Sequence, residues 1–185
     1  MSGAIGSVQL KKEQEMRTGR IRNANYFQHK FVEMPGIQIQ KEIGESSWFG
    51  FSILLVDLDY FKRLNDTYGH DFGDTVLIEF TKLLDSQFPS SAVKARYGGE
   101  EFVVILPKET APVATKLADD FRQCVAKQAI LTSDNKRVFI TCSIGVAQVD
   151  DVDHYSRALK QADEYLYLAK EQGRNKVVSN HTGTL

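Results

Sequence analysis

The chain has 185 residues, a net charge of −1 and 42% hydrophobic residues, which is the composition of one globular domain with a sizeable core. This balance argues against a disordered chain and gives no support to a nucleic-acid binder, which usually carries a basic excess. No apolar run is long enough to span a bilayer, and the first residues lack the apolar segment of a signal peptide. We therefore expect a cytoplasmic protein without membrane insertion, in which any phosphate-rich ligand is bound by a local group of side chains.

The first half of the chain alternates between helical and strand-like patterns. The pattern predicts a helix over Gln9–Glu33 with a break near Gly19, a buried strand over Trp48–Val56, and helices over Tyr60–Tyr68 and Asp71–Phe88. Residues Val93–Leu106 form two β-prone arms around a pair of glycines, which predicts a hairpin.

The second half continues the alternation. It predicts a helix over Ala111–Gln128, a second hairpin over Ile130–Val149 that turns at residues 133–136, a helix over His154–Gln172 ended by Gly173, and a short strand at 176–178. The two cysteines, Cys124 and Cys142, have no zinc or redox spacing and are expected to be reduced and buried.

This order of elements predicts an α/β (α+β) fold in which helices surround a mixed central sheet. No glycine-rich turn follows the first strand, which disfavours a Rossmann fold. The phosphate-binding pattern G-x-x-x-x-G-K-[ST] is absent from the sequence, so a P-loop nucleotide site is excluded.

Two acidic residues stand at the end of the first predicted strand. Asp57 and Asp59 are two residues apart, so in an extended chain they project to the same side. Carboxylates beside a buried strand are costly unless they are paired, hydrated or bound to metal, and Mg²⁺ prefers such oxygen ligands. The alternative is that Asp59 simply caps the helix that follows.

The segment Gly98-Gly99-Glu100-Glu101 is the second candidate. Two glycines permit a tight turn with positive φ, and two acidic residues directly after it favour the delivery of a carboxylate to a shared metal. The alternative for this segment is a solvated hairpin tip.

Lys170 and Arg174 are the third candidate, because residues four apart near the end of a helix share a face and can bind phosphate together. The alternative is favourable placement of cations at a helix C-terminus. In the segment Lys62–Asp74, which joins the second and third predicted helices, Asn65 and Asp74 together match the donors and acceptors of a guanine edge. In the same segment, His70 is either a ligand or a turn residue.

These motifs occur together and in a fixed order: DLDYFKRLNDTYGHDFGD, then RYGGEEF, then AKEQGRN. In that order they resemble the GGDEF family of diguanylate cyclases, in its active GGEEF variant, from about Ser52 to Asn175. The resemblance implies a nucleotidyl-cyclase or palm-like fold with a central, mostly antiparallel five-stranded sheet. It also implies condensation of two GTP molecules into cyclic di-GMP with release of two pyrophosphates.

The resemblance assigns metal binding to Asp57, to the carbonyl of Leu58 and to Glu100. It assigns catalysis to Glu100 and Lys62, with Glu101 helping to bind metal or to position the turn. The implied cofactor is Mg²⁺, two ions in each active site, with Mn²⁺ as an alternative.

The remaining implied residues bind the substrate GTP. Asn65 and Asp74 read guanine, with His70 as a further candidate. The backbone amides of Tyr60 and Phe61 bind the phosphates, together with the side chains of Lys170 and Arg174. One domain carries half of an active site, so catalysis implies a homodimer with two domains facing each other.

Two family motifs are altered here. The opening motif D-x-L-T-G-L-x-N-R-R corresponds to the degenerate segment Met16–Asn25, and an inhibitory Arg-x-x-Asp site is replaced by Pro89 and Ala92. We expect no product inhibition through that second site.

The resemblance implies a catalytic domain over residues 16–180, between an N-terminal tail or end of a signalling helix (1–15) and a C-terminal tail (181–185). No sensory domain is visible, so either the chain is a fragment or a separate regulatory protein promotes dimerisation. The alternative functions are a catalytically weak GTP-binding regulatory module that acts through protein contacts, and a cyclase of other specificity.

Overall fold

The computed structural model describes residues 51–149 and 155–180. The predicted helix Gln9–Glu33, the altered segment Met16–Asn25 and both predicted tails lie outside these residues. They stay predictions.

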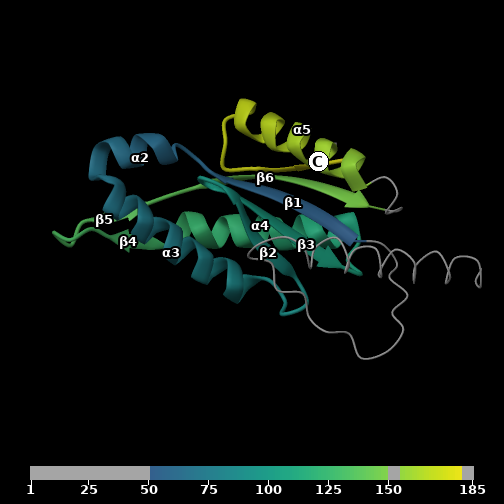
Figure 1. The fold of residues 1–185 in the computed structure, drawn as a ribbon, viewed down its shortest axis with the longest axis horizontal. Coiled ribbons are helices and arrows are strands. Elements are labelled where there is room, and N and C mark those ends of the chain that lie inside the picture. The colour runs from purple at the N-terminus through teal and green to yellow at the C-terminus, as the bar shows by residue number, and fades with distance from the viewer. Residues whose placement is uncertain (1–50, 150–154, 181–185) are drawn as a thin grey trace, which may run out of the picture.

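The described helices and strands follow the alternation expected from the hydrophobic pattern (Figure 1). In chain order they are β1 (Phe51–Leu58), α2 (Phe61–Tyr68), α3 (His70–Gln87), β2 (Val93–Gly98), β3 (Glu101–Pro107), α4 (Ala111–Lys127), β4 (Ala129–Leu131), β5 (Arg137–Phe139), β6 (Cys142–Val149), α5 (Tyr155–Glu171) and β7 (Val177–Ser179).

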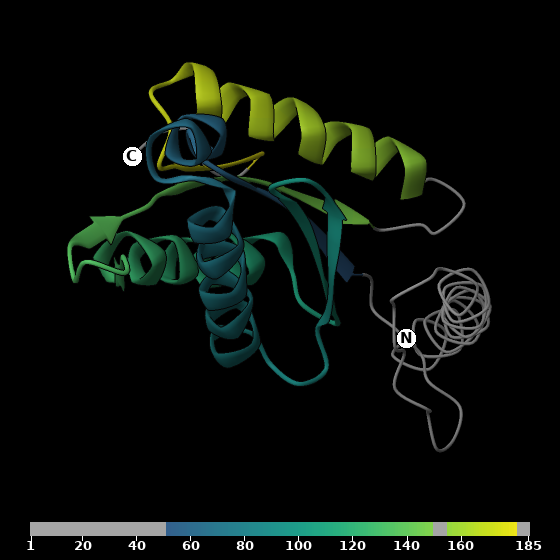
Figure 2. The same ribbon diagram turned by 60° about the vertical axis from the view of Figure 1, so that its left-hand side comes forward.

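The main sheet has five strands in the order β2-β3-β1-β6-β7. The pairs β2–β3, β3–β1 and β1–β6 are antiparallel, and only the pair β6–β7 among them is parallel. Helix α5 covers one face of this sheet, while α3 and α4 cover the other (Figures 1 and 2). The predicted α+β fold with a mostly antiparallel five-stranded sheet is therefore confirmed.

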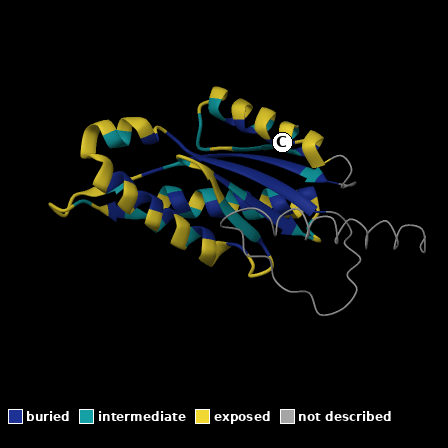
Figure 3. Ribbon diagram, viewed as in Figure 1, coloured by how far each residue is buried: buried dark blue, intermediate teal, exposed yellow. Residues whose placement is uncertain are grey.

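Strand β1 is the central strand of the main sheet. All eight of its residues are buried, as expected for an apolar strand with helices on both faces. Its side chains alternate between two cores. Leu54 and Val56 join the core beneath α3 and α4, whereas Ile53 and Leu55 join the core beneath α5. Figure 3 shows the buried sheet between helices whose outer faces are exposed.

Helix α5 packs with its backbone against Gly145 of the sheet. Its buried face consists of small residues and one leucine, including Ala158 and Ala162. Below them lies Gly145 of β6, where an added Cβ would stand 2.0 Å from the carbonyl oxygen of Ala162 and 2.4 Å from the backbone nitrogen of Leu166. The absence of a side chain at Gly145 therefore sets the height of α5 above the sheet.

The predicted second hairpin is only partly correct. Strands β4 and β5 pair around the turn at residues 132–136 and form a separate two-stranded sheet. The rest of the predicted second arm is β6, which pairs with β1 from Phe51↔Val149 to Leu58↔Cys142. The first arm is only three residues long, so the longer second arm finds its partner in the main sheet.

Both cysteines are free, as predicted. Cys142 is fully covered, and burial raises the pKa of its thiol far above the usual value, whereas Cys124 on α4 is half-buried. Among the described helices, none combines the length and the apolar character needed to cross a bilayer.

Candidate active site

The carboxyl end of β1 places an acidic side chain beside a basic one from α5. The Asp57 side chain is 10% exposed, and its Oδ2 lies 2.7 Å from Nζ of Lys170 in the last turn of α5. The structure thus joins the first and third sites predicted from the sequence, although more than a hundred residues separate them.

The β2–β3 hairpin brings two further acidic residues to this place. Glu101 is the direct cross-strand partner of Asp57, and the carbonyl of Glu100 accepts a hydrogen bond from the N–H of Leu58 at 3.3 Å. Gly99 has a φ of 45°, which a glycine adopts without strain. The predicted tight turn with a left-handed glycine is confirmed at Gly99, and it holds Glu100 over the end of β1.

The pKa of the Asp57 carboxyl is raised above its usual value. Burial is the largest cause; the hydrogen bond and charge of Lys170 act against it, and the charges of Glu100 and Glu101 add to it. Burial is thus the main reason for the raised pKa, and the two glutamates act on Asp57 as neighbouring negative charges.

The donor atoms at this edge fit a magnesium ion that arrives with a nucleotide. Asp57 and Glu100 offer carboxylate oxygens, and the Lys170 ammonium at 2.7 Å already supplies Asp57 with the positive charge that a metal would supply. In the described part of the chain, no three His, Cys, Asp or Glu side chains gather closely enough to hold an ion alone. Mg²⁺ does not need such a cage, because it keeps several waters and binds substrate phosphates through one or two protein carboxylates.

Asp59 does not cap α2, so that alternative is wrong. The residue before α2 is Tyr60, and no side chain caps the helix. Asp59 is 8% exposed and accepts hydrogen bonds from the hydroxyls of Thr141 and Ser143, both at 2.7 Å, and from the N–H of Asn175 at 3.0 Å. A buried carboxylate with three donors is fully paired. Asp59 is therefore a structural link between β1, β6 and the segment after α5.

Helices α2 and α3 carry the two predicted guanine readers, Asn65 and Asp74. The Oδ1 atom of Asn65 is buried and has no hydrogen-bond partner. It lies so close to Gly73 on α3 that an added Cβ there would be 1.9 Å away. Asp74 follows directly and is exposed. An amide and a carboxylate together can offer both donors and acceptors to a base.

His70 is the first residue of α3 and is exposed. It lies four residues before Asp74 on the same helix, so both side chains are on one face. This position fits both a turn residue and a ligand.

The start of α2 faces the segment after α5. Tyr60 has a φ of 58°, a conformation uncommon outside glycine, and it turns the chain from β1 into α2. The N–H groups of the first turn, including those of Phe61 and Lys62, have no side-chain cap, which is the usual arrangement where a helix binds phosphate. The guanidinium carbon of Arg174 lies 4.6 Å from the Tyr60 ring centroid, and the Lys62 side chain is exposed.

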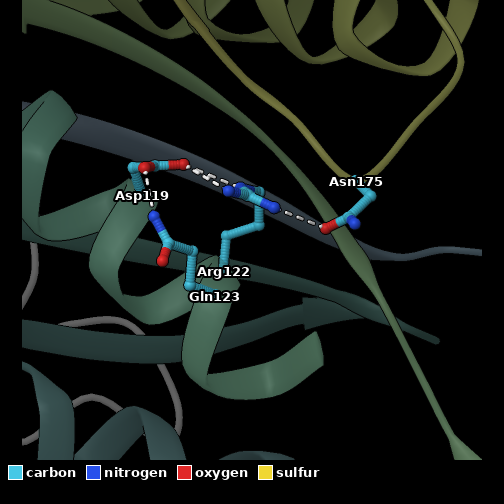
Figure 4. Close-up of polar contacts among 4 residues, drawn as sticks. All are labelled: Asp119, Arg122, Gln123 and Asn175. Atoms are coloured by element: carbon cyan, nitrogen blue, oxygen red, sulfur yellow. Dashed lines mark hydrogen bonds and ion pairs between the residues drawn. The ribbon is translucent and has the colours of Figure 1, made fainter. Parts of the chain in front are cut away.

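The sequence did not reveal two residues that shape this site. Gly73 stands inside a helix, where an isolated glycine signals a packing or functional constraint, and that signal could have found it. Arg122 on α4 donates a hydrogen bond to Asn175 at 2.9 Å (Figure 4). Because this pair depends on tertiary packing, the sequence pattern carries no signal for it.

A cleft of about 350 Å³ lies beside α2. It is bounded by α2, by β5 and by the residues between β5 and β6, with Arg63, Leu64 and Phe139 among its lining residues. Of the candidate residues named from the sequence, Asp59 and Tyr60 border it. The cleft does not include Asp57, Glu100 or the guanine readers.

Comparison with known proteins agrees with this geometry. The family model described as "Diguanylate cyclase, GGDEF domain" matches residues 20–176. Diguanylate cyclase A of Treponema denticola is 42% identical over 127 residues, which are 68% of this chain and 34% of that protein. The response regulator PleD of Caulobacter vibrioides is 43% identical over 129 residues, 69% of this chain and 28% of its own length. The chain thus spans about a third or less of these relatives.

Solved structures give the same result. The diguanylate cyclase SiaD of Pseudomonas aeruginosa, in complex with its activator SiaC, has a TM-score of 0.67 and 33% identity over 71% of this chain and 50% of that chain. The active GGEEF domain of a diguanylate cyclase from Vibrio cholerae has a TM-score of 0.65 and 34% identity over 70% of this chain and 82% of that chain. With the family model extending over most of the sequence, these likenesses show that the chain belongs to the GGDEF domain family of diguanylate cyclases.

Proposed function

We propose that this chain is a diguanylate cyclase that condenses two GTP molecules into cyclic di-GMP and two pyrophosphates. The observation that carries the proposal is the meeting of Asp57, Glu100 and Lys170 at one edge of the sheet, beside the uncapped start of α2. The relatives named as diguanylate cyclases support the same activity.

In the proposed reaction the 3′-oxygen of one GTP bonds to the α-phosphorus of the other, and the bond from that phosphorus to pyrophosphate breaks. Glu100 accepts the proton of the 3′-hydroxyl as a general base. Lys62, Lys170 and Arg174 offset the charge that develops on the leaving pyrophosphate. In a second step the roles of the two nucleotides are exchanged: the 3′-oxygen of the second bonds to the α-phosphorus of the first. This closes the ring and releases the second pyrophosphate.

Divalent metal supports this chemistry in the proposal. Bound Mg²⁺, two ions per site with Mn²⁺ as an alternative, would neutralise the triphosphate and favour the attack. Asp57, the Leu58 carbonyl and Glu100 would hold the ions, and Glu101 either assists them or positions the turn. Asn65 and Asp74, with His70 as a further candidate, would bind guanine, while the backbone amides of Tyr60 and Phe61 would bind phosphate.

The proposed enzyme acts as a homodimer, because each domain offers one set of these residues and the reaction joins two nucleotides. A separate protein that promotes dimerisation is a suitable regulator, and the complex of SiaD with its activator SiaC is a solved example in a similar protein. We place the catalytic domain at residues 16–180, in the cytoplasm, where GTP is available and the free thiols of Cys124 and Cys142 stay reduced.

The proposal is tested by incubation of the purified protein with GTP and Mg²⁺. We expect one cyclic di-GMP for every two pyrophosphates, and activity per subunit that rises with protein concentration in the dilute range. Bound GTP without product at high protein concentration would favour the regulatory module instead. Equal turnover of GTP and ATP would favour a cyclase of other specificity.

We also expect no product inhibition through the altered inhibitory site. The turn before β2 has Pro89 and Ala92, whose backbone groups are joined by a hydrogen bond of 2.9 Å. Neither side chain offers a charge or a donor to a dinucleotide. A calorimetric titration should therefore show no tight binding of cyclic di-GMP at this turn, and tight binding there would contradict the expectation.

A further inference from the structure

The segment that carries Arg174 has an unusual backbone. The chain leaves α5 through Gly173, with a φ of 106°, and then Arg174 and Asn175 follow with φ values of 61° and 47°. Asparagine tolerates this left-handed region, but arginine rarely adopts it. Two consecutive left-handed residues other than glycine persist only where the surrounding structure holds them.

Contacts from two different elements hold this segment at Asn175. The N–H of Asn175 donates to Oδ2 of Asp59 at 3.0 Å, at the end of β1. The side-chain Oδ1 of Asn175 accepts a hydrogen bond from Nη1 of Arg122 at 2.9 Å, from α4 on the opposite face of the sheet (Figures 1 and 4). Both the backbone and the side chain of Asn175 are thus fixed.

Arg122 is itself held in one orientation. Its Nε and Nη2 lie 2.8 and 2.7 Å from Oδ1 of Asp119, and Gln123 donates to the other oxygen of Asp119 at 2.8 Å (Figure 4). Burial alone would raise the pKa of Asp119, but the bonds from Arg122 and Gln123 outweigh it and hold that pKa below the usual value. Asp119 occupies the Nε and Nη2 edge of the guanidinium, and the Arg122 side chain is only 17% exposed. Because the guanidinium is planar, Nη1 is then directed at Asn175.

The left-handed conformation determines where Arg174 points. Its guanidinium lies over the ring of Tyr60, 4.6 Å from the centroid, and Nη1 is 3.5 Å from the tyrosine hydroxyl. This places the charge next to the uncapped start of α2. If the segment relaxed to an ordinary backbone conformation, the Arg174 side chain would leave this position.

We propose that Arg122 is a positioning residue for phosphate binding: through Asn175 it keeps Arg174 in the left-handed conformation that directs its guanidinium at the triphosphate of GTP. This inference rests on the proposed function of Arg174. It adds a residue from the far side of the sheet that touches neither the nucleotide nor the other site residues.

The test compares the binding of two nucleotides in the presence of Mg²⁺. The first is 3′-deoxy-GTP, which lacks the attacking hydroxyl and is not turned over, and the second is GMP, which lacks the phosphates that Arg174 would bind. We expect Arg122→Met to weaken 3′-deoxy-GTP binding about tenfold, as for one charge-assisted contact, and to leave GMP binding unchanged. Arg122→Lys should give an intermediate loss.

Two further variants separate positioning from a general structural role. In an Arg174→Ala background, Arg122→Met should cause no additional loss, because its effect acts through Arg174. The variant Asn175→Gly keeps the permissive backbone and removes the Oδ1 acceptor, and it should reproduce the selective loss even if Arg122→Met folds poorly. Arg157→Met on the exposed side of α5 is the matched control and should bind both nucleotides normally.

The outcomes separate this inference from the proposed function. The positioning role would be overturned if Arg122→Met weakened the binding of GMP and of 3′-deoxy-GTP equally. It would also be overturned if Arg122→Met weakened 3′-deoxy-GTP binding as much in the Arg174→Ala background as in the wild type. Both results would leave the proposed cyclase activity intact. Normal binding by both Arg122→Met and Asn175→Gly would overturn the positioning role in the same way. A wild-type chain that binds no 3′-deoxy-GTP would instead overturn the proposed function together with the inference.

Discussion

Glu100→Gln is expected to lower the turnover of GTP at least a hundredfold while the domain stays folded. Glutamine keeps the shape of the side chain but can neither accept the proton of the 3′-hydroxyl nor offer a charged oxygen to metal, and general-base catalysis alone typically contributes two to four orders of magnitude. The fold should tolerate the change, because Glu100 raises the pKa of Asp57 by repulsion, and its removal relieves that repulsion. Initial rates of pyrophosphate release measure the first effect, and thermal unfolding measures the second.

Glu164→Gln is the matched control for this prediction. Glu164 lies on α5, is 61% exposed, and has its nearest cationic partner, Lys160, at 3.9 Å, so its replacement should leave turnover within a factor of two, as for an exposed surface pair. Turnover by Glu100→Gln within tenfold of the wild-type rate would remove Glu100 from its assigned role. A loss accompanied by a lowered unfolding temperature would point to a structural effect.

Gly73→Ala is expected to raise the KM for GTP at least tenfold without unfolding the protein. The new Cβ would stand 1.9 Å from Oδ1 of Asn65, so the asparagine side chain must turn away from the place where it would contact guanine. The carbon Cζ of Phe61, 3.3 Å away, needs only a small shift. Alanine also favours helix over glycine by roughly 1 kcal/mol, which offsets part of the strain. Steady-state kinetics with GTP and with ATP check both affinity and base discrimination.

The control for Gly73→Ala is Thr75→Ala, an exposed position on the same helix, which should leave both substrates unaffected. The double variant Asn65→Ala with Gly73→Ala should be no worse than Asn65→Ala alone, because the glycine acts through the asparagine. Full GTP affinity in Gly73→Ala would show that Asn65 does not need its present position.

The elements that local pattern determines were predicted well. The long helices α3 and α4 follow from apolar residues at helical intervals, and they end near the predicted residues. The buried run that forms β1 and the glycine turn before Glu100 are equally local signals. The resemblance covers residues far apart in the chain, and the structure brings Asp57, Glu100 and Lys170 to one place.

The features that were missed depend on partners distant in sequence. Asp59 has the local pattern of a helix cap, but Thr141, Ser143 and Asn175 use its carboxylate instead. The three residues of β4 look like one arm of a long hairpin, although most of the other arm pairs with β1. Such outcomes follow from tertiary competition for strand edges and hydrogen-bond donors, which no short window of sequence contains.

The close contact between α5 and Gly145 has a consequence for the stiffness of the site. Lys170 belongs to the rigid end of a helix whose distance from the sheet is fixed by backbone touching backbone, and Asp57 belongs to that sheet. The relative positions of the two backbones that carry this cation and this anion are therefore a property of the packed core. Such a site holds both backbones in place before the nucleotide arrives, so only side chains have to change partners when Asp57 binds metal and Lys170 binds phosphate.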